Sequence, residues 1–179
     1  MKVIIPMAGE GSRFKKISER KQKFEILARE KTLFWWSTYS LSNFFDEEFI
    51  FISRKSHQAK DFIKLECENL GIHKYQIIEI EHQTDGQAST VALANNLVAP
   101  DDAIIIYNID TYVEPEYLLK KHIDPLAEGF VPSFKAPGDK WSFVKTSPLN
   151  PNKVLKVSEK TRISDLATVG FYYFKTWKS

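Results

Sequence analysis

This chain of 179 residues lacks paired cysteines and long apolar runs. Cys67 is the single cysteine, so an intramolecular disulfide is excluded, and its place on an apolar helix face predicts a buried thiol. No apolar run approaches the roughly 20 residues that span a bilayer, and residues 1–6 do not resemble a secretory signal. We therefore expect a cytoplasmic protein with no membrane partner.

Excess charge and histidine clusters are also missing. Lys and Arg number 25 against 23 Asp and Glu, and a net charge of +2 is too small to predict a nucleic-acid partner. The four histidines do not fall at metal-ligand spacing, which argues against a zinc site. With 43% hydrophobic residues, the chain is long enough to form one domain, residues 1–179, without a disulfide or metal.

Short apolar runs alternate with longer amphipathic stretches in the first two thirds of the chain. Strands are expected at residues 3–5, 49–52, 77–80 and 103–107. Helices are expected at about 31–45, 59–70, 87–98 and 115–126. This alternation predicts an α/β fold with a Rossmann-like, doubly wound, mostly parallel sheet.

The pattern changes after about residue 129. Strand-like segments separated by turn residues follow at 131–135, 141–145, 154–157 and 169–174. We expect a β-rich second half carried on the α/β half, so that the large sheet is mixed.

Ligands of open α/β sheets bind at the carboxyl ends of the strands, and three polar segments follow strands here. The first, residues 9–14, places Gly9, Gly11 and Arg13 after the first strand. Exposed backbone amides and a guanidinium suit phosphate, although the dinucleotide fingerprint fails because Phe14 replaces its third glycine. By spacing alone, a glycine turn followed by a solvated basic surface is the simpler interpretation.

The other two segments follow the third and fourth strands. Gly86 would let a flat group lie against the backbone, Gln83 could pair with a base edge, and Asp85 suits a helix N-cap. Asp110 ends the fourth strand, where a carboxylate can hold Mg²⁺ together with substrate phosphates. A plain capped helix start and an exposed turn residue are the competing interpretations.

Taken in order, these segments resemble the sugar-phosphate nucleotidyltransferase family, also called the NTP-transferase or sugar-nucleotide pyrophosphorylase family. The family's phosphate loop corresponds to residues 9–13, and its Pro-Lys-Pro corresponds to Gln22-Lys23-Phe24, where both prolines are replaced. Residues 85–88 resemble its base-binding loop, and Asn108-Ile109-Asp110 resembles its metal-aspartate motif.

Motifs in the second half extend the resemblance. Glu159-Lys160 is similar to the family's acceptor motif, and residues 168–174 are similar to its Val-Gly-x-Tyr strand. Residues 141–145 resemble a branch of capsule and surface-polysaccharide enzymes. Trp141 follows the loop 136–139 and could line the acceptor pocket, although we favour a packing role for it. The resemblance implies a glycosyltransferase-A-like fold.

The resemblance implies a nucleotide-binding half, 1–128, and an acceptor-binding half, 129–179. The implied reaction transfers a nucleoside monophosphate from a nucleoside triphosphate, pyrimidine favoured, to a phosphorylated acceptor such as a sugar 1-phosphate. Pyrophosphate leaves, Mg²⁺ is the cofactor, and the product would serve surface or capsular polysaccharide synthesis.

The resemblance also assigns roles to individual residues. The implied catalytic residues are Arg13, Lys23 and Asp110, the last being also the metal ligand. The nucleotide would contact Ala8, Gly9, Gly11, Ser12, Arg13, Lys23, Gln83, Asp85 and Gly86. The acceptor would contact Asn108, Glu159, Lys160 and Val169.

Two other functions stay open. The acceptor could be a small non-sugar phosphate of the phosphocholine or phosphoglutamine type, or the chain could be a catalytically impaired nucleotide-binding module. The family usually supplies a second metal carboxylate beyond the Val-Gly-x-Tyr strand, whereas this sequence stops at Ser179. Truncation, substitution by Glu159 or Asp165, and impaired activity are all compatible with that ending, as is a homo-oligomer.

Overall fold

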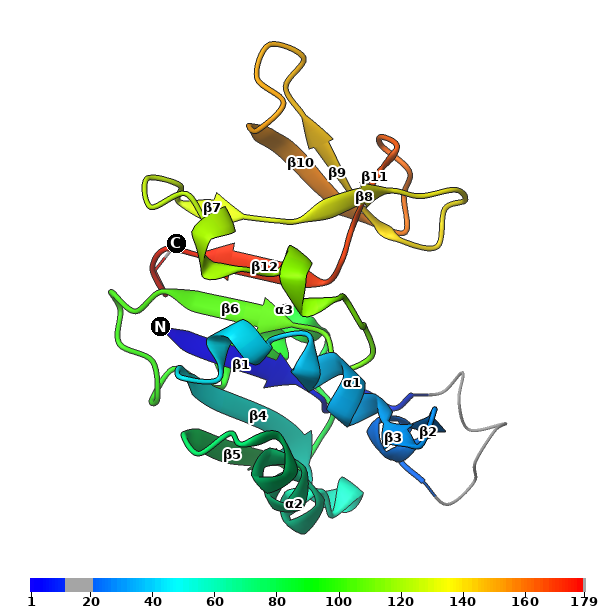
Figure 1. Ribbon diagram of the computed structural model, residues 1–179, viewed down its shortest axis with the longest axis vertical. Coiled ribbons are helices and arrows are strands. Elements are labelled where there is room, and N and C mark those ends of the chain that lie inside the picture. Colours follow the sequence, from blue (N-terminus) through cyan, green and yellow to red (C-terminus); the bar gives the residue numbers. More distant parts are fainter. Residues whose placement is uncertain (12–20, 179) are drawn as a thin grey trace.

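A six-stranded sheet forms the centre of the protein in the computed structural model, which describes residues 1–11 and 21–178 (Figure 1). The strand order is β5-β4-β1-β6-β12-β7. Four of these strands are parallel, namely β1 (Lys2–Pro6), β4 (Glu48–Arg54), β5 (Tyr75–Ile80) and β6 (Ile104–Tyr107). The predicted α/β fold with a mostly parallel, mixed sheet is confirmed.

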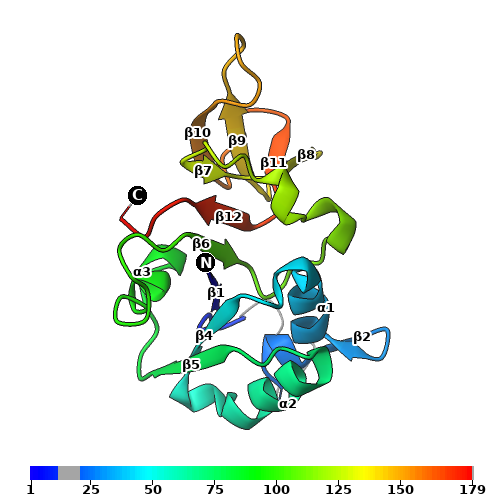
Figure 2. The same cartoon turned by 60° about the vertical axis from the view of Figure 1, so that its left-hand side comes forward.

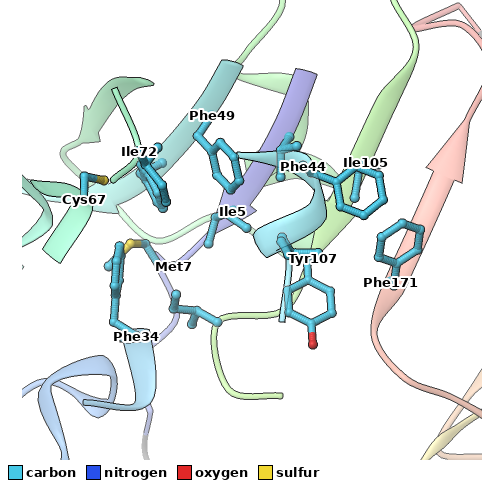
Figure 3. Close-up of a cluster of buried hydrophobic side chains, with 14 of the residues drawn as sticks. Ile5, Met7, Phe34, Phe44, Phe49, Cys67, Ile72, Ile105, Tyr107 and Phe171 are labelled. Carbon is cyan, nitrogen blue, oxygen red and sulfur yellow. The ribbon is translucent and has the colours of Figure 1, made fainter. Parts of the chain in front are cut away.

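Alternating side chains along the parallel strands fill two separate cores, one on each face of the sheet. Val3 and Ile5 of β1 join a core that α1 and α2 cover (Figure 3), whereas Ile4 points to the opposite face and packs near α3. Figure 2 shows α3 on the other side of the sheet from α1 and α2. Burial on both faces explains why these strands appear in the sequence as continuous apolar runs.

Within the described residues, three α-helices cover the sheet, namely α1 (Leu33–Tyr39), α2 (Lys60–Leu70) and α3 (Gln87–Ala92). α2 agrees with its prediction and ends at Gly71, whose left-handed φ of 76° is a common helix stop. Cys67 on α2 is buried, as expected, and burial raises the pKa of its thiol to about 12. Such a thiol serves packing rather than chemistry.

The helix predicted at 31–45 is interrupted. Thr32 caps α1 by accepting a hydrogen bond from the Trp35 amide at 2.9 Å, and the helix ends at Tyr39 before the 3-10 turn η3 (Ser42–Phe44). Ser40 lies at the break, where its hydroxyl donates to the Trp36 carbonyl and accepts from the Val113 amide at 2.9 Å. A side chain that bonds both to its own helix and to a distant loop favours a helix end.

The helix predicted at 87–98 is shorter than expected, and the helix predicted at 115–126 does not form. After α3, residues 93–97 form successive i→i+3 turns rather than α-helical bonds. Residues 115–126 form two short 3-10 turns, η5 (Pro115–Tyr117) and η6 (Lys120–His122). Asn43 donates to the Pro115 carbonyl at 2.8 Å, so a contact with a distant segment fixes this turn conformation.

A second, four-stranded antiparallel sheet lies beyond the large sheet, with the order β10-β9-β11-β8 (Figure 1). Its strands are β8 (Ser133–Lys135), β9 (Ser142–Thr146), β10 (Val154–Glu159) and β11 (Leu166–Thr168). A short hairpin, β2 (Leu27–Ala28) and β3 (Lys31–Thr32), precedes α1. No helix in the described part of the chain is long and apolar enough to cross a membrane.

Two predicted strands of the second half begin two residues later than expected, next to a crossing between the sheets. The predicted strand 169–174 begins in fact at Phe171, because Gly170, with φ of 76°, separates β11 from β12 (Phe171–Phe174). β12 returns to the large sheet and pairs antiparallel with β6. The strand predicted at 131–135 begins in fact at Ser133, as β8 of the small sheet, and the preceding β7 (Gly129–Phe130) belongs to the large sheet. The chain therefore crosses twice between the sheets.

Candidate functional site

The polar segments identified in the sequence gather at one edge of the large sheet. The parallel strands β1, β4, β5 and β6 all end there, and the loops that follow carry Gly9, Asp85 and Asp110. β12 runs in the opposite direction, so its first residue follows Gly170 at the same edge. Residues separated by the whole length of the chain are thereby brought together.

A first hollow of about 160 Å³ lies beneath the loop that follows β1, and we call it the glycine-loop hollow. Its lining comes from the β1 end, the η2 segment and the β6 end, and consists of Pro6, Met7, Gly9, Gly11, Gln22, Lys23, Phe24, Asn108, Ile109 and Asp110. Predicted nucleotide residues and the predicted metal carboxylate therefore share one wall. Ser12 and Arg13, also predicted here, lie outside the described residues.

Lys23 and Asp110, predicted for the same site from distant parts of the sequence, form an ion pair. The side chain of Lys23 is 19% exposed and that of Asp110 is 36% exposed, so both groups remain accessible at the hollow. Gly11 permits this arrangement, because a Cβ at that position would lie 3.0 Å from the Lys23 Cβ. Gly11 also has a φ of 58°, a conformation that other residues rarely adopt.

Lys23 begins the 3-10 turn η2 (Lys23–Glu25), and its neighbours hold that turn in place. The Gln22 amide donates to the Glu25 carboxylate at 2.7 Å, which closes a capping box. Phe24 is buried, with its ring 5.5 Å from that of Phe62 and 5.9 Å from that of His57. The phenylalanine therefore anchors this segment in the core where the family has a proline.

A second hollow of about 680 Å³ lies between the two sheets, and we call it the inter-sheet hollow. Its lining includes Asn108, Asp110, Thr111, Tyr112, Val113, Phe134, Lys140, Trp141, Ser142, Glu159, Lys160, Thr168, Val169, Gly170 and Tyr172. All four predicted acceptor residues are among them. Asn108 and Asp110 line both hollows, so the two meet at the end of β6.

Charged and aromatic side chains line the inter-sheet hollow. Lys160 has a left-handed φ of 52° and forms an ion pair with Glu159 at 2.8 Å. Trp141 is 44% exposed and contacts Phe134 edge-on, with the ring centroids 5.3 Å apart. Trp141 thus lines the hollow as well as packing against Phe134, so both roles considered for it are compatible with the structure.

The loop after β5 reaches the same edge but does not line the glycine-loop hollow. Gln83, Asp85 and Gly86 are exposed there, and Ala8 is buried beside the hollow rather than in its wall. The prediction that Asp85 caps the next helix is wrong, since Gly86 is the N-cap residue of α3 and no side chain accepts a hydrogen bond from the free amides of this helix end. A Cβ on Gly86 would meet nothing within 4 Å, so local packing does not require this glycine.

Three contributors to the site escaped the sequence analysis. Gly170 was quoted only as part of a strand motif, yet a Cβ there would lie 2.4 Å from the Asn108 Nδ2. Tyr172 lines the inter-sheet hollow and shares a hydrogen bond with Thr168 at 3.0 Å. Gln87 donates to the Asn108 Oδ1 at 2.7 Å. No local signal identifies the contacts of Gly170 and Gln87 with Asn108, because each joins segments far apart in the sequence.

Comparison with known proteins is consistent with this geometry. The model of a protein family described as nucleotidyl transferase matches residues 2–177. Among curated proteins, none matches the chain.

Solved structures share the fold over almost the whole chain. The nucleoside-diphosphate-sugar pyrophosphorylase from Vibrio cholerae RC9 is 33% identical, with a TM-score of 0.86 over 98% of this chain and 74% of that one. The inositol-1-phosphate CTP transferase from T. maritima is 15% identical, with a TM-score of 0.79 over 97% and 70% of the two chains. A UDP-glucose pyrophosphorylase complexed with UDP-glucose is 15% identical, with a TM-score of 0.73 over 97% and 75%.

Proposed function

The chain belongs to the nucleotidyl transferase family, and on this premise we propose that it joins a pyrimidine nucleoside monophosphate to a sugar 1-phosphate. A phosphate oxygen of the acceptor bonds to the α-phosphorus of the triphosphate. The bond from that phosphorus to the β-phosphate bridging oxygen breaks, and pyrophosphate leaves. Positioning and charge neutralisation supply most of the catalysis in such a transfer.

The observation that carries the proposal is the meeting of the two hollows. A triphosphate in the glycine-loop hollow and a phosphorylated acceptor in the inter-sheet hollow would have their reacting groups side by side at Asn108 and Asp110. Lys23 lies at the same place, where negative charge develops on the α-phosphate. This arrangement supports an in-line attack between two separately bound substrates.

Each nucleotide residue has a proposed part in binding. The backbone of residues 8–12 and the guanidinium of Arg13 contact the β- and γ-phosphates, while Lys23 contacts the α-phosphate. The exposed loop with Gln83, Asp85 and Gly86 receives the base, and the Gln83 carboxamide can both donate to and accept from a pyrimidine edge.

Asp110 fits a divalent cation, and we propose Mg²⁺. The described residues contain no cluster of three or more His, Cys, Asp or Glu side chains suited to a metal. One carboxylate together with substrate phosphates is the usual environment of Mg²⁺, which would neutralise charge on those phosphates. Asp110 would hold it, and the Lys23 ion pair keeps that carboxylate positioned beforehand.

The lining of the inter-sheet hollow favours a sugar phosphate over a choline-type acceptor. Lys140 and Lys160 would attract the phosphate group of the acceptor. The exposed ring of Trp141 offers a flat apolar face to a sugar, while Glu159 can accept bonds from hydroxyls. Val169 completes the wall, and the similarity of residues 141–145 to capsule-type enzymes suggests a surface-polysaccharide precursor as the product.

A pyrophosphate-release assay tests the proposal. The protein would be incubated with Mg²⁺, each of the common nucleoside triphosphates, and a panel of sugar 1-phosphates, inositol 1-phosphate and phosphocholine. We expect release only when a pyrimidine triphosphate and a sugar 1-phosphate are both present. Preference for phosphocholine would overturn the acceptor class, and triphosphate binding without release under any pair would indicate an impaired module.

A further inference from the structure

Asn108 occupies the boundary between the two hollows, and its backbone is fixed from both sides. Its amide donates to the Gly170 carbonyl at 3.1 Å, and its carbonyl accepts from the Ser37 hydroxyl at 2.6 Å. The carboxamide of Asn108 lies directly against the Gly170 Cα, where a Cβ would be 2.4 Å from Nδ2 and 2.8 Å from Cγ. Gly170 lines only the inter-sheet hollow, so Nδ2 lies on that side.

Gln87 contacts the other end of this carboxamide. It is the first residue of α3, and its Nε2 donates to the Asn108 Oδ1 at 2.7 Å. α3 is held on the sheet by buried Thr90 and Val91, and the Thr90 hydroxyl donates to the Gly86 carbonyl at 3.0 Å. The helix therefore presents Gln87 from a fixed position although the side chain itself is exposed.

We propose that Gln87 is a positioning residue for the transfer reaction, acting through Asn108. By occupying Oδ1, it leaves the NH₂ group of Asn108 turned toward the acceptor phosphate, to which it can donate a charge-assisted hydrogen bond. Rotation of the carboxamide by half a turn would present its oxygen to that phosphate, and two acceptors repel. This inference rests on the proposed function, because it requires a phosphorylated acceptor in the inter-sheet hollow.

The test replaces Gln87 with Leu and with Glu and measures steady-state kinetics for the acceptor. We expect Gln87→Leu to lower kcat/KM for the acceptor about 5- to 10-fold, since one hydrogen bond no longer orients the amide. Gln87→Glu should cost more, because a carboxylate there accepts from the Asn108 NH₂ group and draws it away from the acceptor. Affinity for the triphosphate, measured by calorimetry, should stay unchanged in both variants.

A double-mutant cycle with Asn108→Ala separates positioning from a direct or structural role. Gln87→Leu should have no further effect once the Asn108 carboxamide is gone. Ser89→Ala, an exposed substitution on the same helix, is the matched control and should leave both kinetics and the melting temperature unchanged.

Three outcomes would overturn the role of Gln87. The first is an equal loss of kcat/KM for the acceptor when Gln87→Leu is made in the wild type and in Asn108→Ala. The second is a loss confined to the affinity for the triphosphate. The third is a smaller loss of kcat/KM in Gln87→Glu than in Gln87→Leu. The Glu and Leu comparison does not depend on the folding of the Asn108 variant. If the wild-type protein released no pyrophosphate with any acceptor, the proposed function would fail first, and the role of Gln87 with it.

Discussion

Lys23 and Asp110 neutralise each other where the two hollows meet. A divalent cation that approaches Asp110 has to displace the Lys23 ammonium group, which already satisfies the carboxylate. A triphosphate offers Lys23 another anion and so frees Asp110 for the cation. Metal and nucleotide should therefore strengthen each other's binding, which is a reciprocal coupling.

Substitution of Lys23 by Met should separate these two effects. The rate of pyrophosphate release should fall roughly 10²–10³-fold, because one charge contact with the transition state is lost. Binding of Mn²⁺ to the free protein should become tighter, because no ammonium group competes for Asp110. Calorimetry with Mn²⁺ and the release assay would measure the two quantities.

Lys31→Met is the control for this experiment, since Lys31 lies over the Trp35 ring, 5.2 Å from its centroid, and away from both hollows. It should change neither the rate nor the binding of Mn²⁺. Weaker Mn²⁺ binding after Lys23→Met, or a near-normal rate, would contradict the assigned role. Asp110→Ala should show the same loss of rate, together with loss of Mn²⁺ binding.

At the scale of secondary-structure elements, those buried on both faces could be predicted from the sequence, and those fixed by distant polar contacts could not. The four parallel strands were predictable because burial on both faces requires continuous apolar runs, as in β6. Residues 115–126 were not, because Lys120 bonds to Asp46 and Glu47 from a distant segment and holds a 3-10 turn where local pattern favours a helix. The site followed the same division: Lys23 and Asp110 were predicted from motifs, whereas the contact between Gly170 and Asn108 emerged only from the fold.

The break between β11 and β12 gives a prediction about Gly170. Gly170→Ala should reduce stability by about 2 kcal/mol or more, because the new side chain meets both a left-handed backbone and the Asn108 carboxamide. The displaced Asn108 should also raise the KM for the acceptor. Chemical denaturation and steady-state kinetics would measure these changes.

Gly71→Ala provides the comparison, since Gly71 has the same φ of 76° but would have no atom within 4 Å of an added Cβ. It should cost about 1 kcal/mol from backbone conformation alone and leave the kinetics unaltered. Equal effects of the two substitutions would show that crowding at Asn108 is unimportant.

The 3-10 turn η4 (Lys55–His57) carries a prediction about pH. Burial, with a smaller effect of Arg54, lowers the pKa of His57 to about 4, and its Nε2 accepts from the Arg54 Nε at 2.9 Å. The unfolded chain binds a proton at His57 near pH 6.5, whereas the folded protein does not. Stability should therefore fall as the pH decreases from about 6.5 to about 4.

Denaturant unfolding at a series of pH values would show this effect. In His57→Gln the free energy of unfolding should fall less steeply between pH 6.5 and 5 than in the wild type. The difference in slope should correspond to at most one bound proton. His73→Gln, at an exposed histidine, should retain the slope of the wild type. An identical slope in the wild type and His57→Gln would rule out His57 as the source.

For the whole molecule, the arrangement of two sheets creates two hollows, which under the proposed function would bind the two substrates separately. The large sheet supplies the glycine-loop hollow, and the small sheet with its loops contributes Phe134, Lys140, Trp141, Ser142, Glu159, Lys160 and Thr168 to the inter-sheet hollow. A change on the small sheet should therefore affect the acceptor without affecting the nucleotide. The boundary between the functional halves at residue 128 stays a prediction.

Trp141→Ala tests this separation. It should raise the KM for the acceptor about 3- to 10-fold, because a flat apolar surface is removed from the inter-sheet hollow. Affinity for the triphosphate should be unchanged in calorimetry. Trp35→Ala, on the surface of α1 where Trp35 stacks on Tyr39, is the control and should leave both values as they are. Equal losses for both substrates after Trp141→Ala would argue against two separate regions.

The late return of β12 to the large sheet also affects how the protein can be made. β6 pairs with β1 on one side, but its other side is covered by Phe171–Phe174, which a ribosome synthesises only after the entire small sheet. Until then, the apolar strand Ile104–Tyr107 presents an open edge to other nascent chains. Delayed or prematurely terminated translation should therefore favour aggregation through this strand, and chaperone binding would be most useful during that interval.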